Sequence, residues 1–234
     1  MNTKSSLIIG ISLIIGATIF GEFFYSARAQ RDSIRVVGSA TKRYKSDIVK
    51  WRISIARVVS PKEIQAGYDL LKNDLQALMA FFASHNVPQS SITTQPVNIN
   101  PIYDREGMIG GYSVQQNIYV ISNDVEGVER IALNPSELAT KGVYLQSSYL
   151  EYTFSDLPSI KKELLALATI DARNRAEEIA KSSGAKIGRM ISARTGVFQF
   201  NEPYSYEISD YGIYNTSSKE KDVTVTINAT FTLK

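Results

Sequence analysis

The segment from Asp222 to Leu233 alternates without interruption between apolar and polar side chains. Its apolar positions are Val223, Val225, Ile227, Ala229, Phe231 and Leu233. A period of two residues is typical of a β-strand that buries one face and exposes the other. Such a strand is stable only within a sheet whose buried face is covered, so this segment predicts a globular domain built around a sheet.

Other parts of the chain carry either this period of two or the longer period of a helix. Strands are predicted over residues 34–44, 49–55, 91–103, 112–120, 143–154 and 186–200, and helices over residues 60–86, 124–140 and 157–183. The resulting order is β-β-α-β-β-α-β-α-β-β. Hairpins mixed with helical crossovers predict the α+β class, with a mixed, largely antiparallel sheet packed with about three helices.

Local signals mark the ends of the predicted helices. Ser60-Pro61-Lys62-Glu63 has the form of a capping box, which predicts that the first helix begins there. Asn134-Pro135 predicts a break in the second helix. Gly184 is placed as the left-handed residue that ends the third. His85 stands at the end of the first helix, where we expect it to bond to the last carbonyl oxygens rather than to act in catalysis.

The sequence pattern predicts an apolar helix at the N-terminus. An uncharged run over residues 5–21 follows Lys4, and after Glu22 the apolar character resumes over residues 23–25. The small residues Ala27 and Ala29 then form the small-x-small pattern of a signal peptidase site, which predicts a secretory signal. An uncleaved anchor is the alternative, because a membrane span needs ~20 apolar residues.

Both alternatives place the rest of the chain outside the cytoplasm. We therefore expect residues 1–29 to be a signal peptide or membrane anchor and residues 30–234 to form one extracytoplasmic domain. That domain is expected in the periplasm or cell envelope, soluble after cleavage or tethered to the inner membrane.

Composition narrows the possible chemistry. The chain has no cysteine and one histidine, and its formal net charge is +3. Without cysteine there is no disulfide, thiolate metal site or thiol nucleophile. A single histidine argues against histidine-based zinc sites and Ser-His-Asp triads. The nearly balanced charge, without a basic stripe, argues against a nucleic-acid partner. We expect no enzyme activity, no catalytic residue, no metal site and no cofactor.

Four stretches of the sequence form a further pattern. Together these stretches cover nearly all of residues 34–233. They are residues 34–40 with 47–51, residues 101–103 with 110–114, residues 168–180 with 183–188, and the alternating C-terminal strand. In content and order they resemble the SIMPL-domain family of mostly exported bacterial proteins. Tyr152-Thr153-Phe154 and Lys161 are similar to a subgroup described as membrane proteins. Gly38, a predicted bulge or close backbone approach, is followed by Ser39-Ala40, without the second glycine common in the family.

The resemblance implies a fold more than an activity. It implies an extracytoplasmic α/β domain that assembles in some relatives into large oligomers, and roles such as oxidative-stress resistance or surface immunogenicity. It supplies no active site to carry over. Because the chain lacks cysteine, any protection against oxidants must be indirect.

Tyrosines beside two long loops are the remaining candidates for function. Residues 201–221 have no apolar period, and the second loop covers residues 104–111. The candidate interface residues are Tyr103, Tyr112, Tyr204, Tyr206, Tyr211 and Tyr214. Tyrosine combines a large apolar area with a hydroxyl group at low entropy cost, which suits interfaces. Internal packing is the alternative for Tyr112, and disorder is the alternative for residues 201–221.

These features favour a non-enzymatic envelope protein that forms a homo-oligomer through its loops, and the resemblance implies a link to envelope or oxidative-stress tolerance. One alternative is a module that binds a small molecule in a pocket between helix and sheet. Another is an enzyme that uses only carboxylates, tyrosine or lysine. That enzyme would need two facing acids, which the sequence does not reveal.

Overall fold

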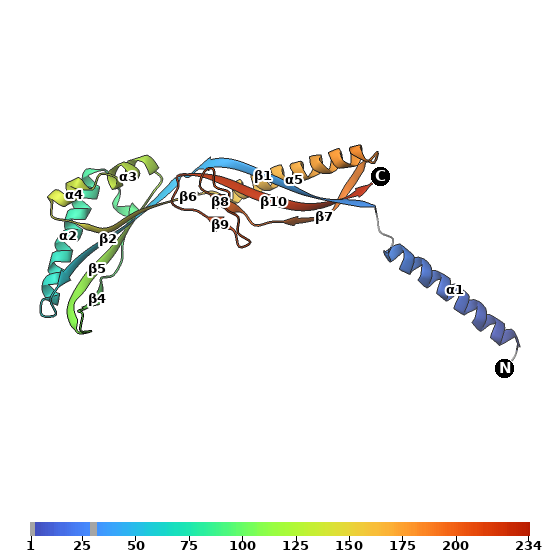
Figure 1. Ribbon diagram of the computed structural model, residues 1–234, viewed down its shortest axis with the longest axis horizontal. Coiled ribbons are helices and arrows are strands. Elements are labelled where there is room, and N and C mark those ends of the chain that lie inside the picture. Colours follow the sequence, from blue (N-terminus) through green and yellow to red (C-terminus); the bar gives the residue numbers. More distant parts are fainter. Residues whose placement is uncertain (1–2, 29–31) are drawn as a thin grey trace. The chain divides into compact units, whose positions relative to one another are not determined.

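The computed structural model describes residues 3–28 and 32–234 (Figure 1). The chain forms two compact units. The first comprises residues 1–40, 165–196 and 226–234, and the second comprises residues 41–164 and 197–225. Three elements contribute residues to both units, namely strand β1 (Ser33–Lys45), helix α5 (Leu157–Ser182) and strand β10 (Glu220–Leu233).

Helix α1, Thr3–Arg28, is apolar over most of its length. Its stretch Leu7–Tyr25 is long and apolar enough to cross a membrane, and none of it is buried inside the protein. At 1.5 Å per residue this stretch measures about 28 Å, close to the thickness of a hydrocarbon core. A signal sequence has the same properties, so α1 fits both expectations. The predicted cleavage site, between Ala29 and Gln30, lies outside the described residues.

The first unit contains a small sheet covered by one helix. Strand β10 lies between β1 and β7 (Ile187–Thr195) and pairs antiparallel with β7. Helix α5 lies along these strands (Figure 1). The alternation predicted for the last strand is confirmed, since Ile227, Ala229 and Phe231 are buried. The helix contributes a buried stripe of small residues, Ala168, Ala172, Ala176 and Ala180, which allows close contact with the sheet.

The second unit holds a five-stranded sheet around β2 (Ile48–Val59). Strand β2 pairs antiparallel with β5 (Ile109–Ser122) on one side and with β6 (Leu145–Thr153) on the other. Strands β3 (Ile92–Thr94) and β4 (Asn98–Tyr103) pair with β5, and the 3-10 helix η1 (Gln89–Ser91) leads into β3. The predicted hairpin of β4 and β5 is confirmed.

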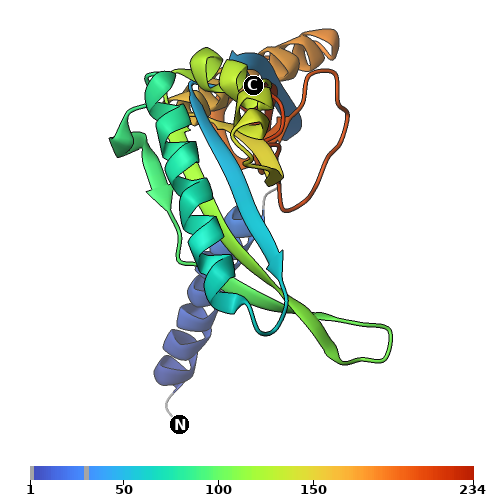
Figure 2. The same ribbon diagram turned by 90° about the vertical axis from the view of Figure 1, so that its left-hand side faces the viewer.

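Three α-helices lie entirely within this unit, α2 (Ile64–Ser84), α3 (Val125–Ala132) and α4 (Ser136–Thr140). Helix α2 lies along β2 and β5 (Figure 2). The core between helix and sheet contains Trp51 and Phe82, whose rings pack edge to face with centroids 5.7 Å apart. The inward positions of β2, namely Val49, Trp51, Ile53 and Ile55, follow the alternation in its sequence and are all buried.

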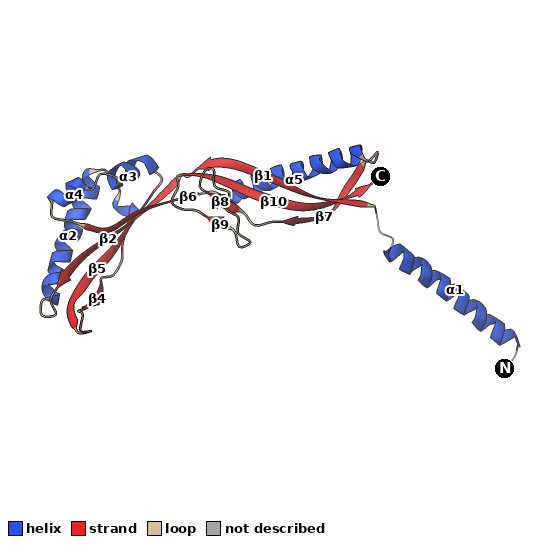
Figure 3. Ribbon diagram, in the orientation of Figure 1, coloured by secondary structure: helices blue, strands red, loops and turns tan. Residues whose placement is uncertain are grey.

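The predicted α+β class is confirmed, and the strands are divided between two mostly antiparallel sheets (Figure 3). One is the sheet around β2. The other contains β1, β10 and β7 together with two short strands, β8 (Gln199–Asn201) and β9 (Ile213–Tyr214). A period of two identifies the buried face of a strand but not its neighbours. The number of sheets therefore had to come from the tertiary structure.

The predicted start of the first long helix is wrong. Helix α2 begins at Ile64, and Glu63 occupies the N-cap position without a side-chain cap. The Ser60 hydroxyl instead donates to the Glu63 carboxylate over 2.8 Å, within a turn that precedes the helix. Because these two side chains satisfy each other, neither bonds to the backbone N–H groups that a capping box requires.

The other predicted helix ends are confirmed. Helix α3 ends at Ala132 and α4 begins at Ser136, on either side of the expected break. Gly184 has a φ of +77°, the left-handed conformation of a helix-ending glycine. The Nδ1 atom of His85 lies 2.9 Å from the Phe81 carbonyl oxygen, in the expected capping position.

Candidate interaction surface

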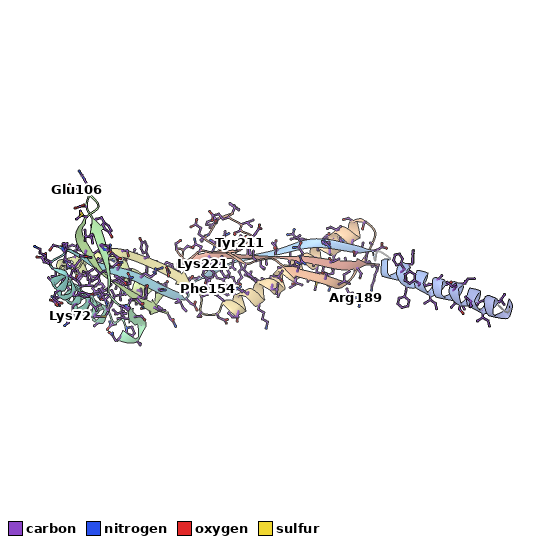
Figure 4. The ribbon with its side chains drawn as sticks, turned by 90° about the horizontal axis from the view of Figure 1, so that it is seen from below. Lys72, Glu106, Phe154, Arg189, Tyr211 and Lys221 are labelled. Carbon is purple, nitrogen blue, oxygen red and sulfur yellow. The ribbon has the colours of Figure 1, made fainter. Side chains whose placement is uncertain are left out.

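Residues 201–221, named here the tyrosine loop, expose several large side chains. Tyr204 is 79% exposed, Tyr206 94%, Ile208 84% and Tyr211 98%. The segment stands out from the strands around it in Figure 2, and Tyr211 points outward in Figure 4. Four exposed residues of this size within eight positions form an exposed, largely apolar patch.

Two buried side-chain amides of strand β8 bond to the backbone of the tyrosine loop. The side-chain amide of Gln199 donates to the Ser209 carbonyl oxygen over 2.7 Å, and that of Asn201 donates to the Glu207 carbonyl oxygen over 2.8 Å. The amide oxygens of both side chains have no hydrogen-bond partner within the described part of the chain. The donated bonds hold the backbone beneath Tyr206 and Tyr211 in one conformation.

Tyr204 is held in a strained conformation by two charged residues. Its φ of +64° is left-handed, which costs a residue with a Cβ atom roughly 1–2 kcal/mol. The Arg43 guanidinium lies 4.5 Å from the centroid of the Tyr204 ring, and Asp222 accepts the Tyr204 N–H over 3.3 Å. Arg43 also forms two bonds of 2.7 and 2.8 Å to Asp222, and these hold the pKa of Asp222 below its ordinary value.

The end of the tyrosine loop packs against the sheets. Strand β9 pairs in parallel with β8, which places Tyr214 beside Phe200 with ring centroids 4.8 Å apart. The Tyr214 hydroxyl lies 2.7 Å from the Thr153 hydroxyl of β6. Tyr214 is 41% exposed, the least of the four tyrosines in the loop. It therefore anchors the loop as well as contributing to its surface.

Lys221, at the last position of the loop, is fully buried. Its ammonium group donates to the Ser46 hydroxyl over 2.9 Å and to the carbonyl oxygens of Tyr152 over 3.0 Å and Ser218 over 2.6 Å. It lies 5.4 Å from the centroid of the Phe154 ring (Figure 4). Each of the three N–H groups has an acceptor, but none of these acceptors is charged. Burial therefore lowers the pKa of Lys221 to about 8.

A second polar cluster, formed by Lys219, Glu129 and Tyr152, adjoins Lys221. Lys219 pairs with Glu129, and Glu129 accepts the Tyr152 hydroxyl over 2.9 Å. The bond from Lys219 lowers the pKa of Glu129, while burial raises the pKa of Tyr152. Backbone bonds from Ser46 N to Lys219 O, 2.9 Å, and from Tyr152 N to Thr216 O, 2.7 Å, complete the attachment. The base of the tyrosine loop is thus attached to β6 and to the turn between β1 and β2.

The hairpin of β4 and β5 presents a second group of exposed side chains. Tyr103 is 61% exposed and Met108 66%, and Glu106 stands at the tip in Figure 4. The Asp104 carboxylate accepts the backbone N–H groups of Glu106 and Met108 over 2.9 Å each, which fixes the turn. Tyr112 lies half-buried within β5, opposite Val59 and Pro101 of the neighbouring strands.

The structure thus brings the predicted tyrosines into two groups, and it adds Lys221, which sequence reasoning missed. A signal for Lys221 existed, because it stands two residues before Val223 on the buried side of the alternating strand. A lysine in phase with the apolar positions of a strand predicts a buried amine. In the described ranges, 3–28 and 32–234, no group of three His, Cys, Asp or Glu side chains is placed to hold a metal ion.

These observations define an α+β protein with an apolar N-terminal helix and a loop that exposes several tyrosines. The SIMPL family model, described as a protein of unknown function (DUF541), matches residues 34–231. The match extends over most of the chain, so the chain belongs to the SIMPL family, as its sequence resemblance predicts. A search of curated proteins gives no match.

Proposed function

We propose that this protein acts outside the cytoplasm as a non-enzymatic domain that associates with further copies of itself. The tyrosine loop and the β4–β5 hairpin tip supply its contact surfaces. The observation that carries the proposal is the exposure of Tyr204, Tyr206 and Tyr211 on a backbone that β8, Asp222 and Lys221 hold in place. A rigid exposed aromatic surface loses little entropy on binding, which favours an interface.

A second copy is the partner that the chain itself favours. In the first unit, β1 and β7 each pair with β10 alone among the described strands, so both present backbone groups along one edge. Open edges of this kind pair readily with another chain. The SIMPL resemblance also implies large assemblies in some relatives. Together with the tyrosine surface, these edges give one copy several ways to contact the next.

The non-enzymatic part of the proposal depends on where the reactive groups lie. His85 caps a helix and its Nε2 atom lies 3.5 Å from Glu137, while the amine of Lys221 is fully buried. Neither His85 nor Lys221 lines the hollow beside the start of α2 or the hollow in the sheet of the first unit. This arrangement supports a binding role for the domain.

Size-exclusion chromatography with light scattering on the full-length protein in uncharged detergent micelles tests self-association. We expect a defined oligomer whose population grows with concentration. A monomer at every concentration would contradict the proposal.

Cell fractionation with N-terminal sequencing tests the location. An intact chain in the membrane, or a product beginning at Gln30 outside the cytoplasm, supports the extracytoplasmic location. An intact soluble chain in the cytoplasm contradicts it.

A small-molecule module is the second candidate. An apolar hollow of about 500 Å³ lies beside the start of α2, lined by residues that include Val58, Leu70 and Ile102. Its walls come from β2, the turn between β2 and α2, α2 itself, β4 and β5. Such a hollow suits an apolar ligand, and a ligand that binds there would raise the melting temperature in a concentration-dependent way.

A further inference from the structure

The sheet of the first unit contains a polar hollow of about 370 Å³. Five residues line it, Arg35 of β1, Ser192 and Arg194 of β7, and Asn228 and Thr230 of β10. The antiparallel register pairs Thr230 with Ser192 and Asn228 with Arg194. The lining therefore comes from all three strands of this unit, in two neighbouring rows.

The hollow lies on the face of the sheet that α5 leaves uncovered. Ala229 is fully buried, as are Ala168 and Ala172 of the helix. Asn228 and Thr230 stand on either side of Ala229 in the strand, so their side chains point to the opposite face. The strands keep these positions rigid, and the uncovered face leaves them accessible to a ligand.

The lining offers hydrogen-bond donors and positive charge. Two guanidinium groups, one amide and two hydroxyl groups surround the hollow, and none of its residues is acidic. Within the described part of the chain, neither Arg35 nor Arg194 forms an ion pair or side-chain hydrogen bond. Elsewhere five arginines pair with carboxylates, namely Arg43, Arg52, Arg57, Arg173 and Arg175. Two unpaired guanidinium groups around one hollow would be stabilised by an anion.

We propose that this hollow binds a phosphate group. The two arginines would donate charge-assisted hydrogen bonds to its oxygens, and Ser192, Thr230 and Asn228 would complete the set of donors. A phosphate presents oxygens in several directions, which matches donors that arrive from three strands. A planar carboxylate has only two oxygens and would leave several donors unused.

The phosphate can belong to a phospholipid headgroup or to a free anion. Arg35 follows the apolar stretch of α1, which ends at Tyr25, by about ten residues, and an extended chain of that length spans at most about 35 Å. A retained α1 would therefore keep Arg35 within reach of a membrane surface. The recognition chemistry is the same for both sources, and the experiment separates them.

Protection of arginine side chains from phenylglyoxal, read by peptide mass spectrometry, measures occupancy of the hollow directly. The full-length protein is placed in uncharged detergent micelles with inorganic phosphate, and in a second arm with chloride at equal ionic strength. Nanodiscs made of phosphatidylcholine alone, or with phosphatidylglycerol or phosphatidic acid added, form the lipid arms. Arg189, exposed on β7 but absent from the lining (Figure 4), is the internal control.

We expect Arg35 and Arg194 to react more slowly when phosphate is present, while Arg189 reacts at an unchanged rate. Protection by inorganic phosphate in micelles identifies a free anion as sufficient. Protection only in nanodiscs with anionic lipid identifies a headgroup. Equal reactivity of Arg35 and Arg194 in phosphate and in chloride, together with equal reactivity in all the nanodiscs, would overturn the proposal.

Substitution gives a second measurement. Arg35→Gln and Arg194→Gln should each weaken binding of the protective anion by roughly tenfold, the loss expected for one charge-assisted bond. Arg189→Gln should leave the affinity unchanged. If the two variants fail to fold, the protection measured on the unaltered protein still decides the matter.

Discussion

Gly38 of β1 packs directly on Ala172 of α5: a Cβ atom at Gly38 would lie 2.6 Å from the Ala172 Cβ and 2.3 Å from the Ala168 carbonyl oxygen. Beside this contact the Ser39 N–H donates to the Asp171 carboxylate over 2.8 Å. The close approach predicted at Gly38 is thus confirmed. Only a residue without a side chain allows the strand and the helix to meet at this distance.

Gly38→Ala should destabilise the first unit by about 1–3 kcal/mol, because the added methyl group overlaps backbone atoms that cannot move independently. Gly110→Ala is the matched control, since the nearest atom to an added Cβ there lies at 3.7 Å. Denaturant unfolding monitored by circular dichroism measures both variants. Equal stability of the two variants would contradict the account of this contact.

Lys221→Met should destabilise the second unit at neutral pH by about 1–3 kcal/mol, because the Ser46 hydroxyl and two carbonyl oxygens lose their donor. Hydrogen exchange should rise most in residues 215–219, which the lysine attaches to the sheets. Lys72→Met, at an exposed position of α2 (Figure 4), should change stability by less than about 0.5 kcal/mol. Unchanged exchange in residues 215–219 would show that the lysine does not hold them.

Stability should rise with pH above about pH 8 through the titration of Lys221. The pKa of this lysine is lowered from 10.5 to about 8 on folding, so between these values the unfolded chain binds a proton that the folded chain has lost. The contribution grows through this window to at most about 3 kcal/mol. Denaturant unfolding from pH 7 to pH 9.5 should show the rise in the unaltered protein and a smaller one in Lys221→Met. Equal slopes would contradict the assignment.

Acid should loosen the tyrosine loop through Asp222. The pKa of Asp222 is lowered on folding, mainly by Arg43, so its stabilising contribution is present above the ordinary aspartate pKa of about 3.9 and is lost as the pH falls through the lower folded value. Hydrogen exchange around Tyr204 should therefore increase in that acidic range. Asp222→Asn should show faster exchange already at pH 7 and little further change on acidification, and a full acid response in this variant would refute the assignment.

The exposed tyrosines should control self-association without affecting folding. Tyr206→Ser with Tyr211→Ser removes two side chains that are 94% and 98% exposed, so the melting temperature should change little. The dissociation constant of the oligomer should rise at least about tenfold, as expected when interface tyrosines are removed. Tyr144→Ser, at a position 67% exposed outside both surfaces, is the control. Equal dissociation constants in all three proteins would remove the tyrosine loop from the interface.

Much of the fold follows from local patterns. The alternation of residues 222–233, the apolar stripe of α5 and the break at Asn134-Pro135 each depend on neighbours within a few positions, and each is present in the structure. The turn at Ser60–Glu63 is the exception. There Ser60 and Glu63, whose residue types suit a capping box, bond to each other instead of to the backbone N–H groups. The residue types alone do not decide between these two local arrangements.

The functional features depend on contacts between distant residues. Lys221 meets Ser46 and Tyr152 only because β10, the β1–β2 turn and β6 converge, and Arg35 shares a hollow with Arg194 only because both strands flank β10. Periodicity along the chain specifies the class of fold, the buried faces and the apolar N-terminal helix, because these depend on short-range geometry. The division into two sheets, the buried amine and the polar hollow arise from strand pairing, which a period of two leaves open.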